Sequence, residues 1–579
     1  MEAGCLCSQT AQLDAATVFL TRWEIPSAQP AHVTAFIIAR VEAGTVVRWL
    51  FGPEPIDDDH PGHLLPRWIF LRALGLIYFS AFYSLAFQIR GLIGPEGILP
   101  ASQYLSILPQ YFPGLQRFWF APTLFWFSSS NHMLMLICWL GLAASVAVFL
   151  NLWPRASLFI CFVCYLSFIA AAQDFASYQS DGMLLEAGFI SFFFAPPGLR
   201  PRFGAAHPPS RASLFLLRWE WFRIYFESGV VKLASGDYSW RHLTAMDDYY
   251  QNGPLPTWVG YYVQHLPHWF HAATALLTLI AELGLVFMLF LPRRWKIVCF
   301  CILTPFQIGI IVTANYTFLN YLVLCLGFLL LDDKLLRRFL PRQWKTEFDA
   351  AAVGPKESSQ SHTIPARFAP RRWLRLAASI VAAWCLILVG YVTAIGLLAT
   401  LPMIGNPFPD APERMLEPFR IANRYGLFAV MTHKRYEIEF QGSNDGKTWN
   451  PYPFRYKPQD PYKAPGIYAP YQPRFEWNLW FASLDDWQRN KFVVRTEERL
   501  LHNNEDALSL FAGNPFASAP PNQVRVMLWQ YWFTSLGEKH RTGAWWNRKL
   551  LGEYAPGLER LPDGQIVFSS EAQPESPRP

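Results

Sequence analysis

The sequence predicts an α-helical polytopic membrane bundle followed by a C-terminal β-rich, sandwich-like soluble domain. Only 16% of the 579 residues are charged and 52% are hydrophobic, whereas soluble domains average about 25% charged residues. Nine apolar stretches between Trp68 and Leu401 approach the roughly 20 residues that span a bilayer. After Thr400 the pattern changes to strand-like alternation with turn residues.

The nine stretches are predicted to be transmembrane helices, of which the fourth and the eighth are the shortest. An odd number of spans places the two ends of the bundle on opposite sides of the membrane. The predicted spans are 68–89, 132–153, 156–173, 180–196, 212–233, 270–291, 295–314, 316–331 and 374–401.

Basic residues gather in alternate loops. Loops after the third and seventh spans hold no Lys or Arg, whereas those after the second, fourth, sixth and eighth do. The richest of these contains Lys334, Arg337, Arg338, Arg342 and Lys345. By the positive-inside rule the N-terminus is cytoplasmic and the C-terminal domain lies on the lumenal or extracytoplasmic face.

The predicted domains follow from these spans. The N-terminal arm has no signal-peptide pattern and is expected to be poorly ordered. The loop from Arg90 to Asn131, rich in Pro, Gly and aromatic residues, is expected to form an interfacial lid. The domains are an arm at 1–66, a bundle of eight helices at 67–332, a cytoplasmic linker at 333–372, a ninth helix at 373–403 and an outer domain at 404–579.

The outer domain shows clear strand signals. Tyr436, Ile438 and Phe440 alternate with polar residues, and Asn444-Asp445-Gly446 supplies a turn, which together predict a hairpin. A second strand is expected at 524–533 and a helix at 483–492. Trp449, Trp477, Trp480 and Trp487 are expected to form the core of this domain rather than a ligand platform.

The fifth span carries an unusual number of charges. Each charge at mid-membrane depth costs roughly 2.5–3.5 kcal/mol on insertion scales. At 100° per residue Glu220, Arg223 and Glu227 lie within about 60° of one another, so they share a helix face. Asp181 and Glu186 of the fourth span are placed to meet them. The predicted intramembrane polar cluster is Glu186, Glu220, Arg223, Glu227 and Lys232.

Two interpretations of this cluster remain open: a structural set of ion pairs, or the lining of a cavity. Lys232 is the candidate catalytic residue, as a base, but it also suits an anion-binding group or a snorkelling lysine at a helix end. Gln307, Asn315 and Asn320 are expected to form hydrogen bonds between helices rather than a transport site.

Known catalytic constellations are missing from the sequence. It contains no G-x-S-x-G elbow, H-E-x-x-H, Walker loop or G-x-G-x-x-G. His265, His268 and His271 are better explained as interfacial histidines than as metal ligands, and Cys161 and Cys164 as packing residues. No cofactor, no metal and no nucleic-acid partner is therefore expected.

Several blocks resemble the lipase maturation factors, membrane proteins that help secreted lipases reach their active, assembled form. In the bundle they are QIRGLIGPEGILP (88–100), SGVVKLASGDYSW (228–240), LTA (243–245), PLPTW (254–258), HLPHW (265–269), IAEL (280–283) and TANYTFLN (313–320). In the outer domain they are NRYGLFAVMT (423–432), EFQGSNDGKTW (439–449), YAPYQPRFEWNLWFASL (468–484) and GAWWNRKLLGEY (543–554).

The family-motif positions singled out in these blocks are Gly229, Asp237, Trp240, Asn315, Tyr316, Asn320, Asn423, Tyr425, Gly426, Gly442, Ser443, Asp445, Gly446, Trp449, Gln472, Pro473, Arg474, Trp477, Trp480, Trp545 and Trp546. The chain departs from the family at Thr313-Ala314-Asn315-Tyr316, where the family has T-G-N-Y.

The resemblance implies a folding or assembly factor, a chaperone whose outer domain engages an exported client. Its partners would be that client, a lipase by resemblance, and membrane lipids. Its location would be the endoplasmic reticulum membrane in a eukaryote or the inner or plasma membrane in a bacterium.

A shorter match suggests an alternative. YFESGVVKL (225–233) is similar to the lysine-bearing segment of the vitamin K-dependent carboxylase group, which places Lys232 where that group has its proposed base. The alternative is a membrane-embedded enzyme that uses Lys232 on a lipid or peptide substrate.

Overall fold

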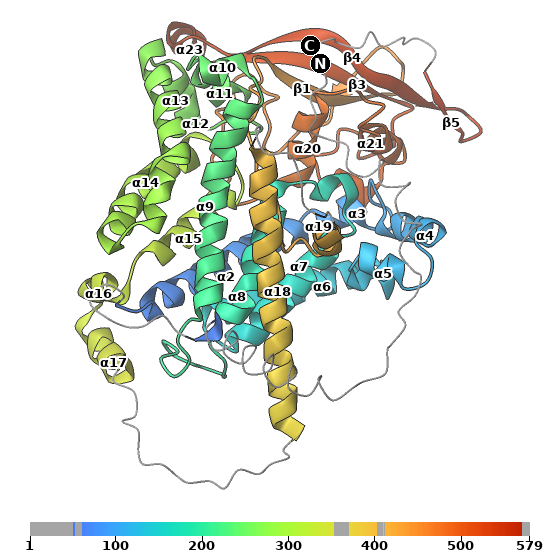
Figure 1. Ribbon diagram of the computed structural model, residues 1–579. Helices are drawn as coiled ribbons and strands as arrows, with labels where there is room; N and C mark the ends of the chain where they lie inside the picture. The colour runs from blue at the N-terminus through green and yellow to red at the C-terminus, as the bar shows by residue number, and fades with distance from the viewer. Residues whose placement is uncertain (1–49, 53–60, 353–369, 402–408, 410, 570–579) are drawn as a thin grey trace, which may run out of the picture. The chain divides into compact units, whose positions relative to one another are not determined.

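The computed structural model describes residues 50–52, 61–352, 370–401, 409 and 411–569. Most of the expected N-terminal arm, residues 1–49 and 53–60, therefore lies outside the described residues. From Leu50 onward the chain forms one compact unit. In this unit the helices are followed by a sheet that lies at one end of them (Figure 1).

Helices form at each of the nine predicted stretches. Several begin at the residue types that satisfy free N–H groups: Ser130 and Ser210 accept hydrogen bonds from Met133 N and Ser213 N, and Pro154 opens its helix. The helices are α2 (Leu64–Ala86), α6 (Asn131–Phe149), α7 (Pro154–Ile169), α8 (Gln179–Phe194), α9 (Arg211–Ala234), α13 with η3 (His268–Leu283, Leu285–Phe290), α14 (Arg293–Thr313), α15 with η4 (Leu319–Gly327, Phe328–Leu330) and α18 (Pro370–Thr400).

Among the described residues, five helices are long and apolar enough to cross a membrane, so nine spans are not confirmed. The five are Leu64–Ala86, Asn131–Phe149, His268–Phe290, Arg293–Thr313 and Ala377–Thr400. α7 and α15 are shorter, and α8 and α9 carry the charged residues discussed below. The five apolar helices make this a membrane protein, while the orientation of its ends stays a prediction.

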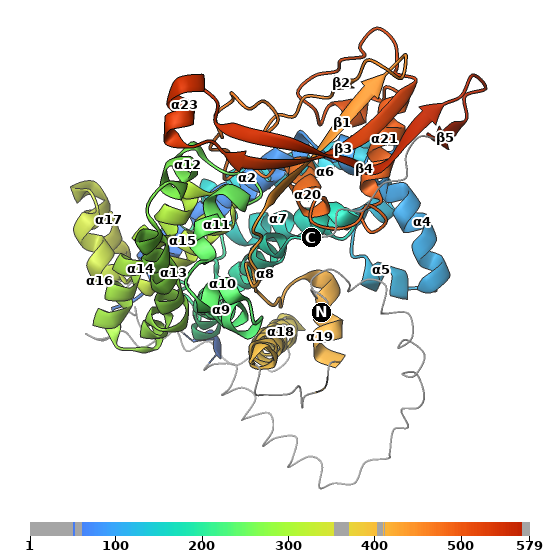
Figure 2. The same cartoon turned by 90° about the horizontal axis from the view of Figure 1, so that it is seen from above.

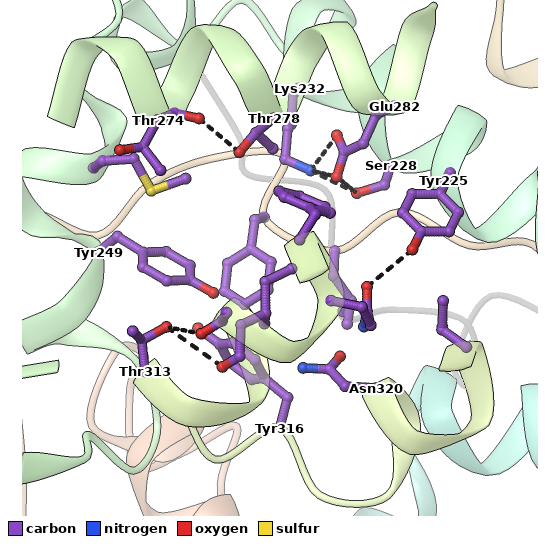
Figure 3. A pocket seen from close by; sticks show the side chains of 18 of the residues that line it. Tyr225, Ser228, Lys232, Tyr249, Thr274, Thr278, Glu282, Thr313, Tyr316 and Asn320 are labelled. Atoms are coloured by element: carbon purple, nitrogen blue, oxygen red, sulfur yellow. Dashed lines mark hydrogen bonds and ion pairs between the residues drawn. The ribbon is translucent and has the colours of Figure 1, made fainter. Parts of the chain in front are cut away.

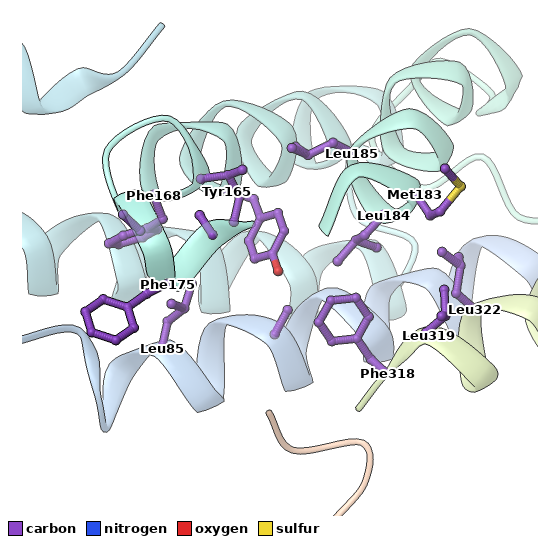
Figure 4. Close-up of a cluster of buried hydrophobic side chains, with 14 of the residues drawn as sticks. Leu85, Tyr165, Phe168, Phe175, Met183, Leu184, Leu185, Phe318, Leu319 and Leu322 are labelled. Atoms are coloured by element: carbon purple, nitrogen blue, oxygen red, sulfur yellow. The ribbon is translucent and has the colours of Figure 1, made fainter. Parts of the chain in front are cut away.

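The core of the bundle is built by α2, α6, α7 and α8. α2 packs on α6, α6 on α7 and α7 on α8. A Cβ atom at Gly75 would lie 2.9 Å from the backbone nitrogen of Phe149, so glycine allows the close approach of α2 and α6. Leu85, Tyr165, Phe175 and Leu184 meet in the hydrophobic cluster between these helices (Figure 4).

Short helices fill the connections. The stretch from Arg90 to Asn131 contains α3 (Ile89–Ile93), α4 (Ala101–Tyr111), α5 (Gln116–Phe120) and η1 (Leu124–Trp126), and it exposes Leu115 and Trp119. Exposed apolar side chains suit an interfacial position, which remains a prediction. Elsewhere the connections form η2 (Gln173–Ala176), α10 (Tyr238–Arg241), α11 (Ala245–Asn252), α12 (Trp258–Gln264), α16 (Asp333–Leu336), η5 (Arg337–Phe339) and α17 (Arg342–Ala352).

The outer domain is built on one antiparallel five-stranded sheet in the order β2-β1-β3-β4-β5 (Figure 2). Its strands are β1 (Arg435–Ser443), β2 (Asn450–Pro451), β3 (Gln523–Phe533), β4 (Trp546–Arg560) and β5 (Ile566–Phe568). Its helices are α19 (Ala411–Leu416), η6 (Glu417–Phe419), α20 (Arg474–Ala482), α21 (Phe492–Leu501), α22 (Glu505–Leu508) and α23 (Leu536–Thr542).

The expected sandwich is wrong for the described residues. α20 packs on β1 and α21 packs on β3 and β4, so helices cover the sheet where a second sheet was expected. The helix expected at 483–492 is also wrong, since this stretch forms turns and α21 begins only at Phe492. Asp485 and Asp486 bond nearby backbone N–H groups there, which favours turns over a helix.

The predicted hairpin is confirmed. β1 pairs with β2 antiparallel, with Gln441 opposite Pro451. Gly446 has φ +68°, a conformation that glycine adopts without strain. The Asp445 carboxylate accepts hydrogen bonds from the N–H groups of Thr448 at 2.7 Å and Lys447 at 2.9 Å. These bonds lower the pKa of Asp445 to about 2.

An isolated acid lies beneath the sheet. Glu497 on α21 is fully buried, and neither carboxylate oxygen has a hydrogen-bond partner among the described residues. Burial, reinforced by the nearby carboxylate of Glu553, raises the pKa of Glu497 well above its ordinary value. The folded state therefore holds this proton at pH values where the unfolded chain has released it.

We predict that Glu497→Gln stabilises the protein at neutral pH. With a pKa raised in the folded state, stability falls as pH rises above the unfolded value of about 4.3. Glutamine removes this loss, so the variant should exceed the wild type in melting temperature at pH 7, and the advantage should shrink toward pH 4. Thermal unfolding of the full chain in detergent across this pH range measures the effect.

Glu498→Gln is the matched control, because Glu498 is the next residue but is exposed and 3.3 Å from Arg495. It should change the melting temperature little at any pH. An advantage of Glu497→Gln that does not vary with pH would contradict the buried-acid account.

Candidate functional site at the junction of bundle and outer domain

Four of the five charged residues on α9 point toward other parts of the chain. Arg223 is fully buried and forms an ion pair with Glu186 of α8, and its Nη1 lies 4.0 Å from Glu227 Oε1. Arg218 instead donates to the carbonyl of Leu329 at 2.9 Å, on a different side of the helix. Glu220 is buried but forms no hydrogen bond with any described residue. The structure thus joins three members of the predicted cluster and leaves Glu220 apart.

The same charges receive the segment that enters the outer domain. Arg223 Nη1 donates to the carbonyl of Asn423 at 2.6 Å, and Glu186 Oε2 accepts from Asn423 N at 2.9 Å. Glu227 Oε2 accepts from Tyr425 N at 2.6 Å. Gly426 N donates to Gln179 Oε1 at 2.9 Å, one residue further on. Backbone groups of 423–426 therefore complete the hydrogen bonding of charges on α8 and α9.

Lys232 belongs to a separate pair. Its Nζ lies 2.8 and 2.7 Å from the two carboxylate oxygens of Glu282 on α13, and 2.6 Å from Ser228 Oγ. Lys232 and Glu282 are both buried. A Cβ atom at Gly229 would lie 2.8 Å from the Leu283 side chain, so glycine lets α9 approach α13 closely enough to form the pair. The partner of Lys232 is thus Glu282 rather than Glu227 or Glu186.

A third buried charge joins the outer domain to α8. Arg474 on α20 donates from Nη1 to Asp181 Oδ2 at 2.7 Å and from Nη2 to Asp181 Oδ1 at 2.8 Å. Tyr165 donates to Asp181 Oδ1 at 2.6 Å. Arg474 and Asp181 are nearly completely buried. Two parallel N–H···O bonds in a site without water fix both distance and orientation.

Uncharged motif residues add further links. Asn315 donates to the carbonyl of Gly466 at 2.9 Å and accepts from Tyr468 N at 2.7 Å, so it holds an outer-domain loop rather than another helix. Trp240 Nε1 donates to the carbonyl of Phe428 at 2.8 Å. Tyr316 packs against Phe428, with ring centroids 5.0 Å apart.

The remaining motif residues of α10 and α20 lie at the same junction. Asp237 caps α10 by accepting from Ser239 N and also bonds Met431 N. Gln472 is buried, and its carbonyl accepts from Gln88 Nε2 at 2.8 Å. Pro473 is the N-cap of α20, on which Trp477 and Trp480 are buried.

A junction on the other side was not expected from the sequence. Arg435 at the start of β1 is fully buried and donates to the carbonyls of Gln251 at 3.1 Å and Pro254 at 3.0 Å, between α11 and α12. Glu437 pairs with Arg435 and with Lys457. The alternation that predicted β1 assigned Glu437 to solvent, but it is buried because two cations flank it.

Both tryptophans of the GAWW motif lie beside this junction. The ring of Trp546 lies 4.3 Å from that of Phe533 and 5.5 Å from the Arg435 guanidinium. Trp545 lies 4.9 Å from Tyr261 of α12.

The other motif residues are local to the hairpin. Gly442 makes room for Phe516, whose ring a Cβ would meet at 2.4 Å, and Ser443 Oγ accepts from Gly446 N at 2.9 Å. Trp449 is half-buried beneath the Arg525 guanidinium, 4.0 Å from its ring centroid. These residues shape the turn, at a distance from the bundle charges along the sheet.

The structure also shows what sequence reasoning missed. Glu282 lies in the IAEL block, and a Glu inside an apolar span is itself a signal for a buried cation nearby. The pairing of Asp181 with Arg474 joins positions 293 residues apart, for which the sequence offers no periodic signal. Within the described ranges no group of three or more His, Cys, Asp or Glu side chains is arranged to hold a metal ion.

We predict that Lys232→Arg preserves function whereas Lys232→Met lowers the amount of folded protein. Arginine keeps the charge opposite Glu282, while methionine leaves that carboxylate buried without its cation, at a cost of about 3–5 kcal/mol. Protein in the membrane fraction and rescue of secreted lipase activity are the two measurements. Loss of rescue in Lys232→Arg at normal protein amounts would instead support the enzyme alternative, because arginine does not act as a base.

Comparison with known proteins agrees with the motif blocks. Residues 65–338 match the lipase maturation factor transmembrane domain, and residues 421–556 match the lipase maturation factor C-terminal domain. The chain is 32% identical over 534 residues to lipase maturation factor 1 of Mus musculus, covering 88% of this chain and 90% of that protein.

Human relatives match similarly. Lipase maturation factor 1 of Homo sapiens is 32% identical over 524 residues, with 86% of this chain and 89% of that protein covered. Lipase maturation factor 2 of Homo sapiens is 31% identical over 593 aligned positions, with 86% and 83% covered. No solved structure matches the chain. With both domains matched and relatives above 30% identity along most of its length, the chain belongs to the lipase maturation factor family.

Proposed function

We propose that this protein is a membrane-anchored maturation factor for an exported client, a lipase by family, and that its outer domain contacts the client. In this proposal the outer domain faces the lumen or the extracytoplasmic space. The membrane is that of the endoplasmic reticulum in a eukaryote and the inner or plasma membrane in a bacterium. The alternation of basic loops supports this orientation.

The free edge of β4 is the observation that carries the proposal. β4 pairs with β3 along its length, but β5 pairs only with Leu558–Arg560. No described strand pairs with the other side of Asn547–Leu551, a segment within the GAWWNRKLLGEY block. An unpaired strand edge presents a row of N–H and C=O groups that an extended segment of another chain pairs with.

The side chains of this edge suit a selective contact. Leu550 and Leu551 are 46% and 40% exposed and offer apolar contact area. Arg548 and Lys549 are exposed beside them, and positive charges on an edge oppose indiscriminate pairing. A partly folded client that exposes an unpaired strand with apolar and acidic side chains is the partner that this edge fits. The buried junctions described above hold this edge in a fixed position relative to the membrane.

We predict that Leu550→Asp combined with Leu551→Asp abolishes most maturation activity. The measurement is the activity of secreted lipase per milligram of lipase, in cells that lack their own maturation factor and receive this protein or the variant. Both leucines are exposed, so the folded protein should accumulate normally, while carboxylates on the edge repel an acidic strand and remove its apolar contacts.

Leu536→Asp on α23 is the matched control, because Leu536 is 48% exposed but lies outside the strand edge. It should rescue as the wild type does. Equal rescue by the β4 variant would contradict contact through this edge, and failure of the wild type itself would contradict a lipase as the client.

A further inference from the structure

A cavity lies between α9, α13, α14 and α15, closed on one side by residues 425–428 (Figure 3). Its volume is about 310 Å³. Most of its lining is aromatic or aliphatic, including Ile224, Phe306, Val323 and Phe428. This volume is at the lower end of the range for small-molecule sites, about 300–1,000 Å³, and apolar walls with few polar groups are typical of such sites.

The charges in the wall cancel. Lys232 and Glu282 line the cavity, but they are paired with each other at 2.7 and 2.8 Å, and Ser228 Oγ takes the remaining direction of the amine. No other Asp, Glu, Lys or Arg is among the lining residues. A charged ligand would enter an apolar space without a free counter-charge, so the cavity favours an uncharged one.

One polar group in the cavity lacks a partner. The Asn320 side chain is 93% buried, since 7% of it is exposed, and its Nδ2 forms no hydrogen bond with any described residue. In Figure 3 this amide points into the space between Tyr225 and Tyr316. A buried N–H group without an acceptor costs about 1–3 kcal/mol, so a carbonyl or ether oxygen of a ligand would be bound there.

The cavity adjoins the surface that faces lipid. α13 and α14 are both apolar enough to span, and only 33% and 17% of their apolar windows are buried in the protein. Pro305 and Gly309 of α14 line the cavity, and a Cβ at Gly309 would meet no atom within 4 Å. Proline removes one backbone hydrogen bond of α14 and glycine leaves a gap in its surface. A ligand dissolved in the bilayer therefore has a short path inward.

We propose that this cavity binds an uncharged acyl lipid with one chain, of the monoacylglycerol class. The ester carbonyl accepts a hydrogen bond from Asn320 Nδ2, and the chain lies among the aromatic residues of α9 and α14. The volume suits one chain rather than a two-chain phospholipid. The proposal rests on the cavity alone and holds whether or not the β4 edge binds a client.

The test is photolabelling of the full-length protein in detergent with a monoacylglycerol that carries a diazirine in its chain. We expect labelled peptides from α13, α14 and α15, and competition by unlabelled monoolein. Oleate, which has the same chain but a charged head, should compete at least about tenfold more weakly. Equal competition by oleate, or labels spread over all lipid-facing helices, would overturn the proposal.

Two variants locate the site. Asn320→Leu keeps the size of the side chain but removes the donor, so labelling should require about tenfold more probe, as expected for one buried hydrogen bond. Gly309→Phe places a ring in the cavity and should abolish labelling. Gly537→Phe on α23 is the control, because a Cβ there also meets no atom within 4 Å but lies outside the cavity.

Size-exclusion chromatography confirms that each variant is folded before labelling is compared. Folded Gly309→Phe that labels as the wild type does would overturn the assignment of this cavity. Unchanged labelling of folded Asn320→Leu would overturn the role of the amide in binding the ester.

Discussion

The structure depends on a single constraint: carboxylates buried in the helical bundle must be satisfied by groups that arrive from the outer domain. Glu186 and Glu227 accept hydrogen bonds from the backbone of 423–425, and Asp181 is paired with Arg474. None of the three carboxylates is accessible to water. Bundle and outer domain therefore complete each other.

The magnitudes show why this constraint dominates. Removing one partner of a buried ion pair costs about 3–5 kcal/mol, whereas a whole domain is stable by about 5–15 kcal/mol. Losing the outer domain would leave Asp181 without Arg474 and two glutamates without their N–H donors. Surface pairs such as Arg489 with Asp485, at 3.7 Å, contribute far less. The outer domain is thus part of the folding unit of the bundle, and it holds the β4 edge in one orientation.

Local features were predicted well from the sequence, and long-range ones were not. The β1–β2 hairpin followed from alternation and Asn444-Asp445-Gly446, because turn chemistry acts over a few residues. Helices at all nine apolar stretches followed from composition, but the charges of α8 and α9 reduce the number that qualify as spans to five within the described ranges. The charges stay buried because outer-domain groups reach them.

The pairing of charges shows the same limit. Helical spacing placed Glu220 beside Arg223, yet Arg223 pairs with Glu186 because α8 packs on α9. Lys232 was recognised as unusual, while its partner Glu282 lies 50 residues away on α13. The sandwich was expected because several strands were visible, whereas the apolar face of the sheet is covered by α20 and α21. Which helix meets which is decided by tertiary packing, for which the sequence contains no periodic signal.

The most direct test of a fixed outer domain is a distance measured between it and the bundle by double electron–electron resonance. Spin-labelled unnatural amino acids would replace Arg294 on α14 and Lys549 on β4, both of which are exposed. The account predicts one narrow distance distribution in the wild type and a broad one after Asp181→Asn, which weakens the pair with Arg474. A broad distribution in the wild type, or an unchanged narrow one in the variant, would contradict it.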